Sequence, residues 1–567
     1  MPKIQNILTF ILLTTFVLFA KPTDSNSTLE NNQTINLLQQ SFKKNSRTLL
    51  KNISQKKFLK HFYRKNRYNP LWIVDNKLNE KKYSTLFKYI DEDITLSSKS
   101  KILMQYKNIQ DSLENNLTTD TLLKIEIKLS SLYYNFLKHT LYGEIKWKNF
   151  SYRLSALKNS KINASWIRTK APYKIEKLMI QENIDQTIEE ITPKKFGYQG
   201  LLSSLAKLNE LRINGGWKKL PSFKKLKIGK KSKYVTKLRS RLKISGDYEE
   251  CNDDSNKLLA NQENNLTIKD NELFGKCLDK AVKSFQQRHG LVVDGVVGSG
   301  TQKALNISVD KKIEKVLLNI DRIKWLPRDD NNQYIVVNIP EFMLHYIENK
   351  ETKQKLRVIV GDRRHPTPIF SQFISFIVLN PYWKVPEGIV KREVVPAMIK
   401  DPSYLQKHGL EAHKNWNENS EVVDTSWLYW EDYLDDTMEF PYRLMQPPGP
   451  RNALGKIKFK FPNRFSVYLH DTPTKYLFKR TIRAFSHGCV RLSQPRELLK
   501  TIASFNKNIN LKKARTILKG KQKTQLDMKN KLRIYLVYLT AGMNNEGKLE
   551  FRNDIYHYDK YTKRASN

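Results

Sequence analysis

Cysteine is scarce in this chain, with only Cys251, Cys277 and Cys489 among 567 residues. The sequence has no Cys-x-x-Cys pair and no His-Glu-x-x-His string, which excludes the commonest zinc-binding patterns. His408 and His413 stand five residues apart and are the only hint of a metal enzyme. We therefore expect no metal and no cofactor. Beyond the first 20 residues, no apolar run reaches the ~20 residues that a membrane-spanning helix needs, so a multispanning protein is excluded.

Acidic residues are also few, at 56 against 100 lysines and arginines, giving a net charge of +44. The lysines are spread along the whole chain beside many asparagines, which indicates a general compositional bias and not a localised binding patch. Attraction to an anionic cell envelope is the alternative interpretation. Hydrophobic residues at 39% and aromatic residues at 11% suffice for packed cores, which excludes a disordered protein. The length allows two to four domains.

The first 20 residues predict a signal peptide. A basic start at Lys3 precedes the apolar run Ile7–Phe19, and Ala20 offers a small residue for cleavage. Leu18 fits the small-x-small cleavage rule imperfectly, so an uncleaved anchor is the alternative. No cysteine follows the run, which argues against a lipoprotein. We expect the mature chain to lie beyond the inner membrane, without a stable anchor after cleavage and without nucleic-acid partners.

Helical periodicity dominates the first half of the mature chain. Residues 21–54 are polar and predict a flexible leader, and residues 55–215 predict a helical scaffold domain. Apolar residues between Leu122 and Phe136 recur at three- and four-residue steps, which indicates one buried helix face. The pair Gly215-Gly216 marks the boundary to the next unit.

Residues 216–308 predict a small helical domain. One amphipathic helix ends near Gly246, and a second ends at Gly290, as helix C-termini prefer. The intervening residues 247–272 predict a loop or insertion. Cys251 and Cys277 flank that loop, and the sequence leaves open whether they form a disulfide.

A glycine-rich stretch, Gly290 to Gly298, and a last helix starting at Thr301 complete this domain. Together with Phe285-Gln286, the pattern resembles the small peptidoglycan-binding domain that accompanies cell-wall enzymes. A helical domain without any ligand is the alternative.

Residues 309–567 predict a mostly-β domain that follows a connecting helix near Ile313–Trp325. Six expected strands are rich in β-branched and aromatic residues; they are Tyr334–Asn338, Phe342–Ile347, Leu356–Val360, Phe373–Leu379, Lys456–Phe461 and Ser466–Leu469. A late hairpin is expected from Ile534–Leu539 and Lys548–Phe551.

The succession of expected strands is interrupted over residues 395–445, which predicts a capping insertion. Its aromatic residues Trp427, Tyr429, Trp430 and Tyr433 either cover a cleft or pack the insertion's own core.

Cys489 carries the chemistry that the sequence favours. A thiol is a nucleophile only as thiolate, and a nearby imidazole can accept its proton. His487 lies two residues away, but the intervening Gly488 indicates a turn. His470 ends an apolar strand 19 residues earlier, and an adjacent antiparallel strand would bring it opposite Cys489.

Other residues of this segment are candidates for oxyanion and substrate binding. Backbone N–H groups at Gly488 and Cys489 can bind an oxyanion, and Tyr468, on the same strand face as His470, can donate its hydroxyl. Arg491 either binds a substrate carboxylate or makes a structural salt bridge. Ser486 and His487, which precede the nucleophile, join this group.

His470 followed by Ser486-His487-Gly488-Cys489-Val490-Arg491 resembles the motif of the L,D-transpeptidase (YkuD-like) catalytic domain. The whole layout resembles the YcbB-type branch of that family. The resemblance implies a multidomain α+β protein with a helical scaffold domain, a helical peptidoglycan-binding domain and a mostly-β catalytic domain with a capping insertion. It also implies the periplasm of a Gram-negative bacterium as the location and peptidoglycan stem peptides as partners.

The resemblance implies a mechanism as well. Cys489 would attack the third residue of a stem tetrapeptide, D-alanine would leave, and an amine of a second stem would resolve the thioester as a 3→3 cross-link. His470 would be the base, and a backbone carbonyl would orient it. Two rival functions stay open, a stem-peptide carboxypeptidase with the same residues and a wall-binding scaffold without catalysis. The sequence does not fix the acceptor, the stem chemistry or the oligomeric state.

Overall fold

The computed structural model describes residues 25–44, 50–114, 118–251, 272–434 and 438–562. The expected signal peptide, residues 1–20, lies outside these ranges. The chain divides into two compact units: the first comprises residues 1–138 with 173–190, and the second comprises 139–172 with 191–567. Residues of the expected scaffold range 55–215 contribute to both. Across the described ranges, no helix combines the length and the apolar character that crossing a membrane requires.

The first unit is helical. Its helices are α1 (Ser25–Lys44), α3 (Lys56–Lys65), α4 (Glu80–Glu92), α5 (Lys101–Leu113), α6 (Thr119–Tyr142, whose last turn belongs to the second unit), α8 (Ile175–Met179) and α9 (Ile184–Ile191), with a small ladder of β1 (Ile73–Val74) and β2 (Lys77–Leu78). The apolar face predicted between Leu122 and Phe136 is buried in α6. Glu126 on the same helix is also buried and accepts hydrogen bonds from the Tyr63 hydroxyl at 2.6 Å and from the Trp72 amide at 2.9 Å, which offsets the cost of burying it.

The second unit begins with helical segments and a small helical domain. They are α7 (Trp147–Ala156), α10 (Tyr198–Ile213), α11 (Tyr234–Ile244), α13 (Lys276–Arg288), α14 (Ser299–Leu305) and α15 (Val309–Ile323). Helices α11, α13 and α14 share one apolar core that includes Leu238, Val282 and Phe285. Cys251 and Cys277 are joined as a disulfide with their Cα atoms 5.9 Å apart, which answers the question that the sequence left open.

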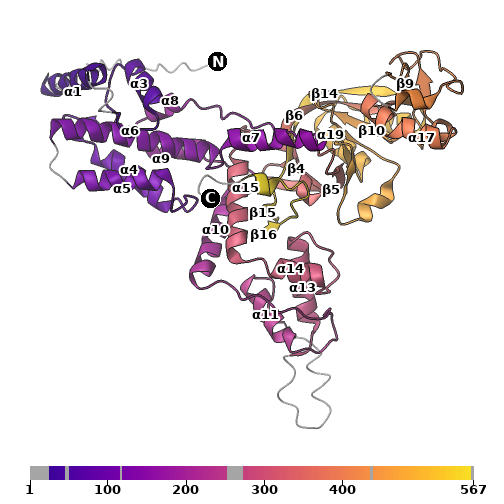
Figure 1. The fold of residues 1–567 in the computed structure, drawn as a ribbon, viewed down its shortest axis with the longest axis horizontal. Helices are drawn as coiled ribbons and strands as arrows, with labels where there is room; N and C mark the ends of the chain where they lie inside the picture. Colours follow the sequence, from indigo (N-terminus) through magenta and orange to yellow (C-terminus); the bar gives the residue numbers. More distant parts are fainter. Residues whose placement is uncertain (1–24, 45–49, 115–117, 252–271, 435–437, 563–567) are drawn as a thin grey trace, which may run out of the picture. The chain divides into compact units, whose positions relative to one another are not determined.

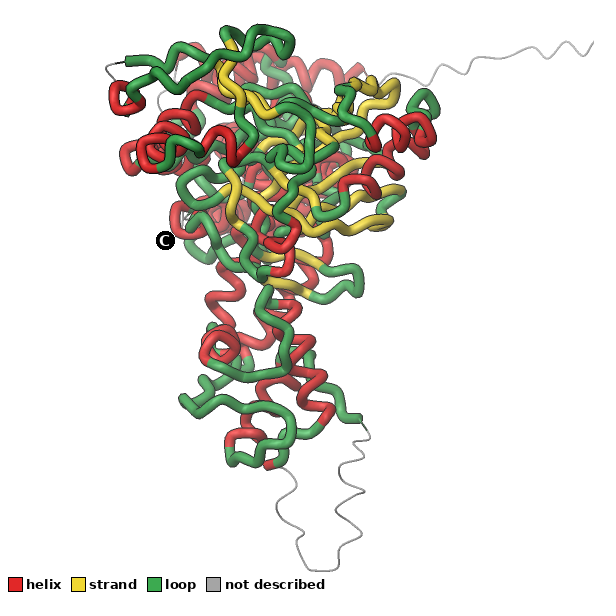
Figure 2. The backbone as a smooth tube through the Cα atoms, turned by 90° about the vertical axis from the view of Figure 1, so that its right-hand side faces the viewer, coloured by secondary structure: helices red, strands yellow, loops and turns green. Residues whose placement is uncertain are grey.

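A nine-stranded sheet forms the centre of the second unit, and Figure 2 shows its strands gathered in one region. The strands are β3 (Gln333–Asn338), β4 (Met343–Glu348), β5 (Glu351–Gly361), β6 (Phe370–Leu379), β10 (Ile457–Lys460), β11 (Leu469–His470), β12 (Ala484–Ser486), β13 (Val490–Leu492) and β14 (Thr524–Val537). Their order is β12-β5-β13-β11-β10-β6-β14-β3-β4, and β4 also pairs with β5. The sheet therefore closes on itself, which removes most exposed edges.

Apolar side chains fill this closed sheet, and two helices add to the same core. Helices α19 (Pro495–Phe505) and α20 (Leu511–Lys519) contribute Leu498, Ile502 and Leu518. On another face, α10 and α15 lie side by side and share a second core with residues of β3 and β14, among them Tyr334 and Tyr535. The fold is multidomain α+β, as the sequence predicts, with helical N-terminal regions, a small helical domain and a mostly-β domain.

Three strand predictions differ from the structure. The strand expected at Ser466–Leu469 begins only at Leu469 and ends at His470. The strand that carries His470 pairs with β13 in parallel, not antiparallel, because the chain turns back through the short helix Lys475–Lys479 and β12 before it enters β13. The late hairpin pairs β15 (Ala541–Met543) with β16 (Leu549–Phe551), whereas Ile534–Val537 belongs to β14. Thr540 lies between β14 and β15. Its amide does not join either strand, because it donates to the Asn319 side chain at 2.8 Å.

The insertion begins and ends further out than expected. A three-stranded sheet of β7 (Trp383–Lys384), β9 (Arg443–Gln446) and β8 (Glu411–His413) frames it, so that it extends beyond residues 395–445 on both sides. The helical segments α16 (Glu387–Ile389), η4 (the π-helical turn Val390–Val394), α17 (Val395–Lys400) and α18 (Tyr404–His408) complete it. Trp430 and Tyr433 pack in its own core, whereas Trp427 and Tyr429 are exposed.

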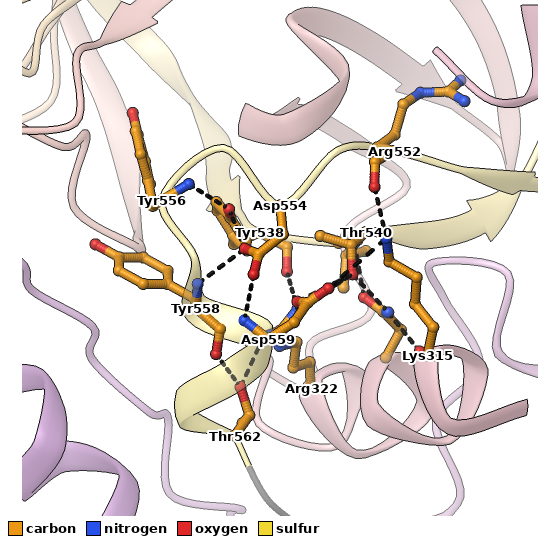
Figure 3. A network of polar contacts seen from close by, with 12 residues as sticks. Lys315, Arg322, Tyr538, Thr540, Arg552, Asp554, Tyr556, Tyr558, Asp559 and Thr562 are labelled. Atoms are coloured by element: carbon orange, nitrogen blue, oxygen red, sulfur yellow. Dashed lines mark hydrogen bonds and ion pairs between the residues drawn. The ribbon is translucent and has the colours of Figure 1, made fainter. Parts of the chain in front are cut away.

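A polar network ties the connecting helix α15 to the C-terminal segment (Figure 3). The buried Arg322 guanidinium pairs with Asp559 at 2.7 Å, and the Thr540 hydroxyl donates to the same carboxylate at 3.0 Å. Tyr538 donates to Asp554 at 2.6 Å and accepts from the Tyr556 amide. These contacts fix the position of Tyr556, whose hydroxyl bonds the backbone of Gly361 and Thr367.

Candidate active site

All seven residues that the sequence singles out line one cavity of about 390 Å³ in the second unit. They are Cys489, His470, Gly488, Tyr468, His487, Ser486 and Arg491. The cavity lies between the closed sheet and the insertion, which contributes Trp383, Ile389 and Arg392 among others. Residues from distant parts of the sequence therefore meet at Cys489.

Cys489 stands at the end of a tight turn between β12 and β13. Gly488 has a φ of +109°, a backbone conformation that side chains with a Cβ disfavour. The Gly488 amide donates to the Ser486 hydroxyl at 3.2 Å, and that hydroxyl donates to the Cys489 carbonyl. A Cβ at position 488 would not clash, because its nearest neighbour would be 3.8 Å away. The turn therefore requires glycine because of its backbone conformation.

The carbonyl of Gly488 is held from a neighbouring loop. The Thr367 hydroxyl donates to it at 2.8 Å and accepts from the Gly361 amide at 2.8 Å. The Tyr556 hydroxyl donates to the Gly361 carbonyl at 2.7 Å and accepts from the Thr367 amide at 3.2 Å. Every polar group in this chain of contacts has a partner, which favours a single conformation of the nucleophile turn.

His470 lies buried at the end of β11. Its Nδ1 contacts the Asp471 backbone carbonyl at 2.5 Å, so this nitrogen carries the proton and Nε2 is the basic one. The Asp471 carboxylate instead pairs with Lys475 at 2.6 Å. Burial, reinforced by the charge of Arg491, lowers the pKa of His470 to about 3, so the imidazole is neutral at neutral pH.

Cys489 is likewise uncharged in the resting protein. Burial raises the pKa of its thiol, opposed by the Tyr468 amide, the Lys458 ammonium and the Tyr468 hydroxyl. The neutral thiol and the neutral imidazole favour proton transfer during attack over a resting thiolate–imidazolium pair. Burial and the neighbouring Cys489 raise the pKa of Tyr468 well above its usual value, so its hydroxyl remains a donor.

Lys458 is a residue that the sequence analysis missed. It is the cross-strand partner of His470, and its Nζ lies 3.8 Å from the centre of the Tyr468 ring. Burial, helped by Lys460, lowers the pKa of Lys458 to about 8. Period-two alternation on the strand Lys456–Phe461 places Lys458 and Lys460 on one face, but only the pairing with β11 shows which face.

Arg491 has no ion pair in the described part of the chain. Its Nη1 donates to the Thr474 hydroxyl at 3.3 Å, and its Nε is buried without a hydrogen-bond partner among the described residues. Of the two interpretations of Arg491, the structural salt bridge finds no partner in these residues. The other interpretation, that Arg491 binds a carboxylate of the substrate, stays a prediction.

His487 contacts the insertion. Its Nε2 lies 2.5 Å from Glu393 in the π-helical turn Val390–Val394, and its ring lies 4.6 Å from that of His365. The hydrogen bond to His487 lowers the pKa of Glu393. Glu393 and His487 are 94 positions apart in the sequence, and no local pattern indicates their contact.

Comparison with protein families finds three matches in this chain. Residues 332–519 match the L,D-transpeptidase catalytic domain, residues 57–205 match the family described as a scaffold domain, and residues 233–305 match a domain described as "Putative peptidoglycan binding domain".

Two curated proteins are similar over part of their length. A protein of Haemophilus influenzae named "Putative L,D-transpeptidase" is 34% identical over 46% of this chain and 50% of its own length. The N-acetylmuramoyl-L-alanine amidase CwlM of Mycobacterium tuberculosis is 41% identical over 14% of this chain and 18% of its own. The chain thus spans half or less of the length of either relative. A crystal structure of an L,D-transpeptidase from Xylanimonas cellulosilytica, 15% identical over 56% of this chain and 99% of that chain, has a TM-score of 0.17, too low to bear on the fold.

Proposed function

Because residues 332–519 form an L,D-transpeptidase catalytic domain and residues 233–305 a peptidoglycan-binding domain, we propose that this chain is a cysteine-dependent peptidoglycan L,D-transpeptidase. Its product is a 3→3 cross-link between two stem peptides, made in the periplasm of a Gram-negative bacterium. The observation that best supports this proposal is the gathering of Cys489, His470 and five further motif residues around one cavity.

In the first step, the Cys489 sulfur attacks the carbonyl carbon of the third residue of a stem tetrapeptide. His470 Nε2 accepts the thiol proton as the C–S bond forms, since Nδ1 is held by the Asp471 carbonyl. The oxyanion accepts hydrogen bonds from the Tyr468 hydroxyl and the Cys489 amide. The Gly488 amide is already engaged by Ser486, so we give it a supporting role in the turn.

Collapse of this intermediate breaks the C–N bond to the terminal D-alanine. His470 returns its proton to the departing amine, and a thioester of Cys489 remains. An amine of a second stem then attacks the thioester carbonyl and loses a proton to His470. The C–S bond breaks, Cys489 regains the proton, and the two stems are joined. The insertion that walls the cavity favours an amine over water as acceptor, because it reduces access of solvent.

Mass spectrometry of the purified protein with disaccharide-tetrapeptides tests the proposal, beside the variant Cys489→Ala. We expect a dimer that has lost one D-alanine, absent with the variant. Tripeptide monomers alone, formed only when Cys489 is present, would instead identify a carboxypeptidase. If neither product forms, the chain is a wall-binding scaffold and the proposal is wrong.

A further inference from the structure

The walls of the Cys489 cavity carry an unbalanced positive charge. Among the described residues that line it, two are arginines, Arg392 and Arg491, and none is acidic. Arg491 comes from the sheet at β13, and Arg392 comes from the insertion at the π-helical turn Val390–Val394. Two guanidinium groups without a facing carboxylate favour an anionic ligand in the cavity.

The Arg392 guanidinium lies beside Gly388, which has no side chain. Its Nη2 is 2.9 Å from the position that a Cβ on Gly388 would occupy, and no other atom lies as near to that position. The guanidinium therefore lies directly beside the backbone of Gly388. In the described part of the chain Arg392 makes no ion pair, so its five N–H donors remain for a ligand.

The neighbour of Arg392 is anchored at the nucleophile turn. Glu393 Oε1 lies 2.5 Å from His487 Nε2, and His487 is two residues from Cys489. The π-helical turn carries both Arg392 and Glu393, and short π-helical segments are frequent at functional sites. This contact therefore fixes the insertion to the turn at the point where Arg392 lines the cavity.

We propose that Arg392 recognises a carboxylate of the donor stem peptide, and that the contact between Glu393 and His487 holds Arg392 in position for this role. The inference rests on the proposed function, since it names the part of the substrate that the insertion binds. A planar guanidinium can hold a carboxylate through two parallel hydrogen bonds, which selects the ligand by geometry as well as by charge. The carboxylate is either the C-terminal one of the departing D-alanine or one elsewhere on the stem.

Acylation of Cys489, followed by intact-protein mass spectrometry, tests the inference. The variants are Arg392→Ala, Arg392→Lys and, as a matched control, Lys400→Ala, an exposed cation of the insertion that does not line the cavity. The donors are the free tetrapeptide, its C-terminal amide, and a tetrapeptide amidated at its other carboxylates.

With the free tetrapeptide, we expect Arg392→Ala to lower kcat/KM for thioester formation on the order of 10- to 100-fold, with partial recovery in Arg392→Lys and no change in Lys400→Ala. The loss should vanish with the donor whose amide replaces the recognised carboxylate, which also identifies that carboxylate. An equal loss with all three donors, or no loss with any, would overturn the inference.

Gly388→Ala provides an independent variant, because its methyl group would meet Arg392 Nη2 and require the guanidinium to shift. We expect it to lower the same rate constant, and to add nothing in the Arg392→Ala background. Additive effects of the two substitutions would show that Gly388→Ala does not act through Arg392.

Binding separates this inference from the proposed function. Calorimetry with Cys489→Ala measures affinity for the three donors without any reaction. If the wild-type protein forms no thioester but Arg392→Ala still weakens binding of the donors that keep the recognised carboxylate, and of no other donor, the proposed function fails and the carboxylate recognition stands. If thioester forms and binding is unaffected by Arg392→Ala, the inference fails and the proposed function stands.

Discussion

The Thr367 hydroxyl donates a 2.8 Å hydrogen bond to the carbonyl of Gly488, the residue that precedes Cys489. The same hydroxyl accepts from the Gly361 amide, so one side chain satisfies two buried backbone groups. At Gly361 a Cβ would lie 2.0 Å from the His365 carbonyl oxygen, which shows how tightly the loop from Gly361 to Thr367 folds back on itself. The shape of the nucleophile turn thus depends on a loop more than 100 residues earlier.

Thr367→Val should distort this turn. The substitution keeps the side-chain shape but leaves the Gly361 amide and the Gly488 carbonyl without their partner, at a cost of about 1–3 kcal/mol for each buried group. We expect lower stability in urea unfolding and slower alkylation of Cys489. Thr367→Ser retains the hydroxyl and should be close to wild type in both measurements. Equal behaviour of the valine and serine variants would show that the hydroxyl is dispensable.

Gly488→Ala should impair the protein through backbone strain. A φ of +109° costs a residue with a Cβ about 1–3 kcal/mol, and relaxation of the turn would shift Cys489. We expect a loss of stability together with a larger loss of thioester formation. Gly449→Ala is the matched control, since Gly449 has an ordinary φ and open space around it. A fully active Gly488→Ala variant would contradict the strain argument.

Lys458→Met should make the Cys489 thiol less acidic. Removing the ammonium disfavours the thiolate, so the thiol pKa should rise by about one unit, equivalent to a tenfold lower thiolate fraction near pH 7. Because the pKa of Lys458 is about 8, the difference from wild type should narrow above that pH. The pH dependence of iodoacetamide alkylation measures both effects. Lys458→Arg keeps the charge and should retain the wild-type profile, whereas an unchanged profile in Lys458→Met would refute the electrostatic role.

Stability should depend on pH through His470. The unfolded chain protonates this imidazole at about pH 6.5, whereas the folded protein does so only at about 3. Between these values the unfolded state binds more protons, so the free energy of unfolding falls as the pH is lowered, by up to ~1.4 kcal/mol per pH unit from this group. His470→Gln should flatten the urea-unfolding stability measured between pH 7 and pH 4. A slope identical to wild type would show that the folded pKa is not depressed.

Local sequence patterns predict much of the fold. The strands predicted at Tyr334–Asn338 and Phe373–Leu379 lie within β3 and β6, because buried strands of a closed sheet are rich in β-branched and aromatic residues. The turn at Gly488 was predicted from its missing side chain, and φ confirms it. The motif around Cys489 is short in sequence, so its members reach the same cavity with few intervening elements.

Contacts between distant segments could not be predicted in this way. The parallel pairing of β11 with β13 depends on how residues 471–489 cross back, which no periodicity encodes. Glu393, Thr367 and Lys458 are single polar residues that belong to no sequence motif, and the role of each depends on a partner elsewhere in the chain. Hydrophobic patterns report which face of an element is buried, but not which polar group meets which.

The insertion has a consequence for how this domain can diversify. Leu379 at the end of β6 and Ile457 at the start of β10 are directly paired in the sheet, so the whole insertion is one enlarged hairpin loop with its own apolar core. Closure of the sheet does not require it. Natural variation can therefore lengthen, shorten or replace this loop, and with it one wall of the cavity, while Cys489 and His470 stay on an unaltered frame.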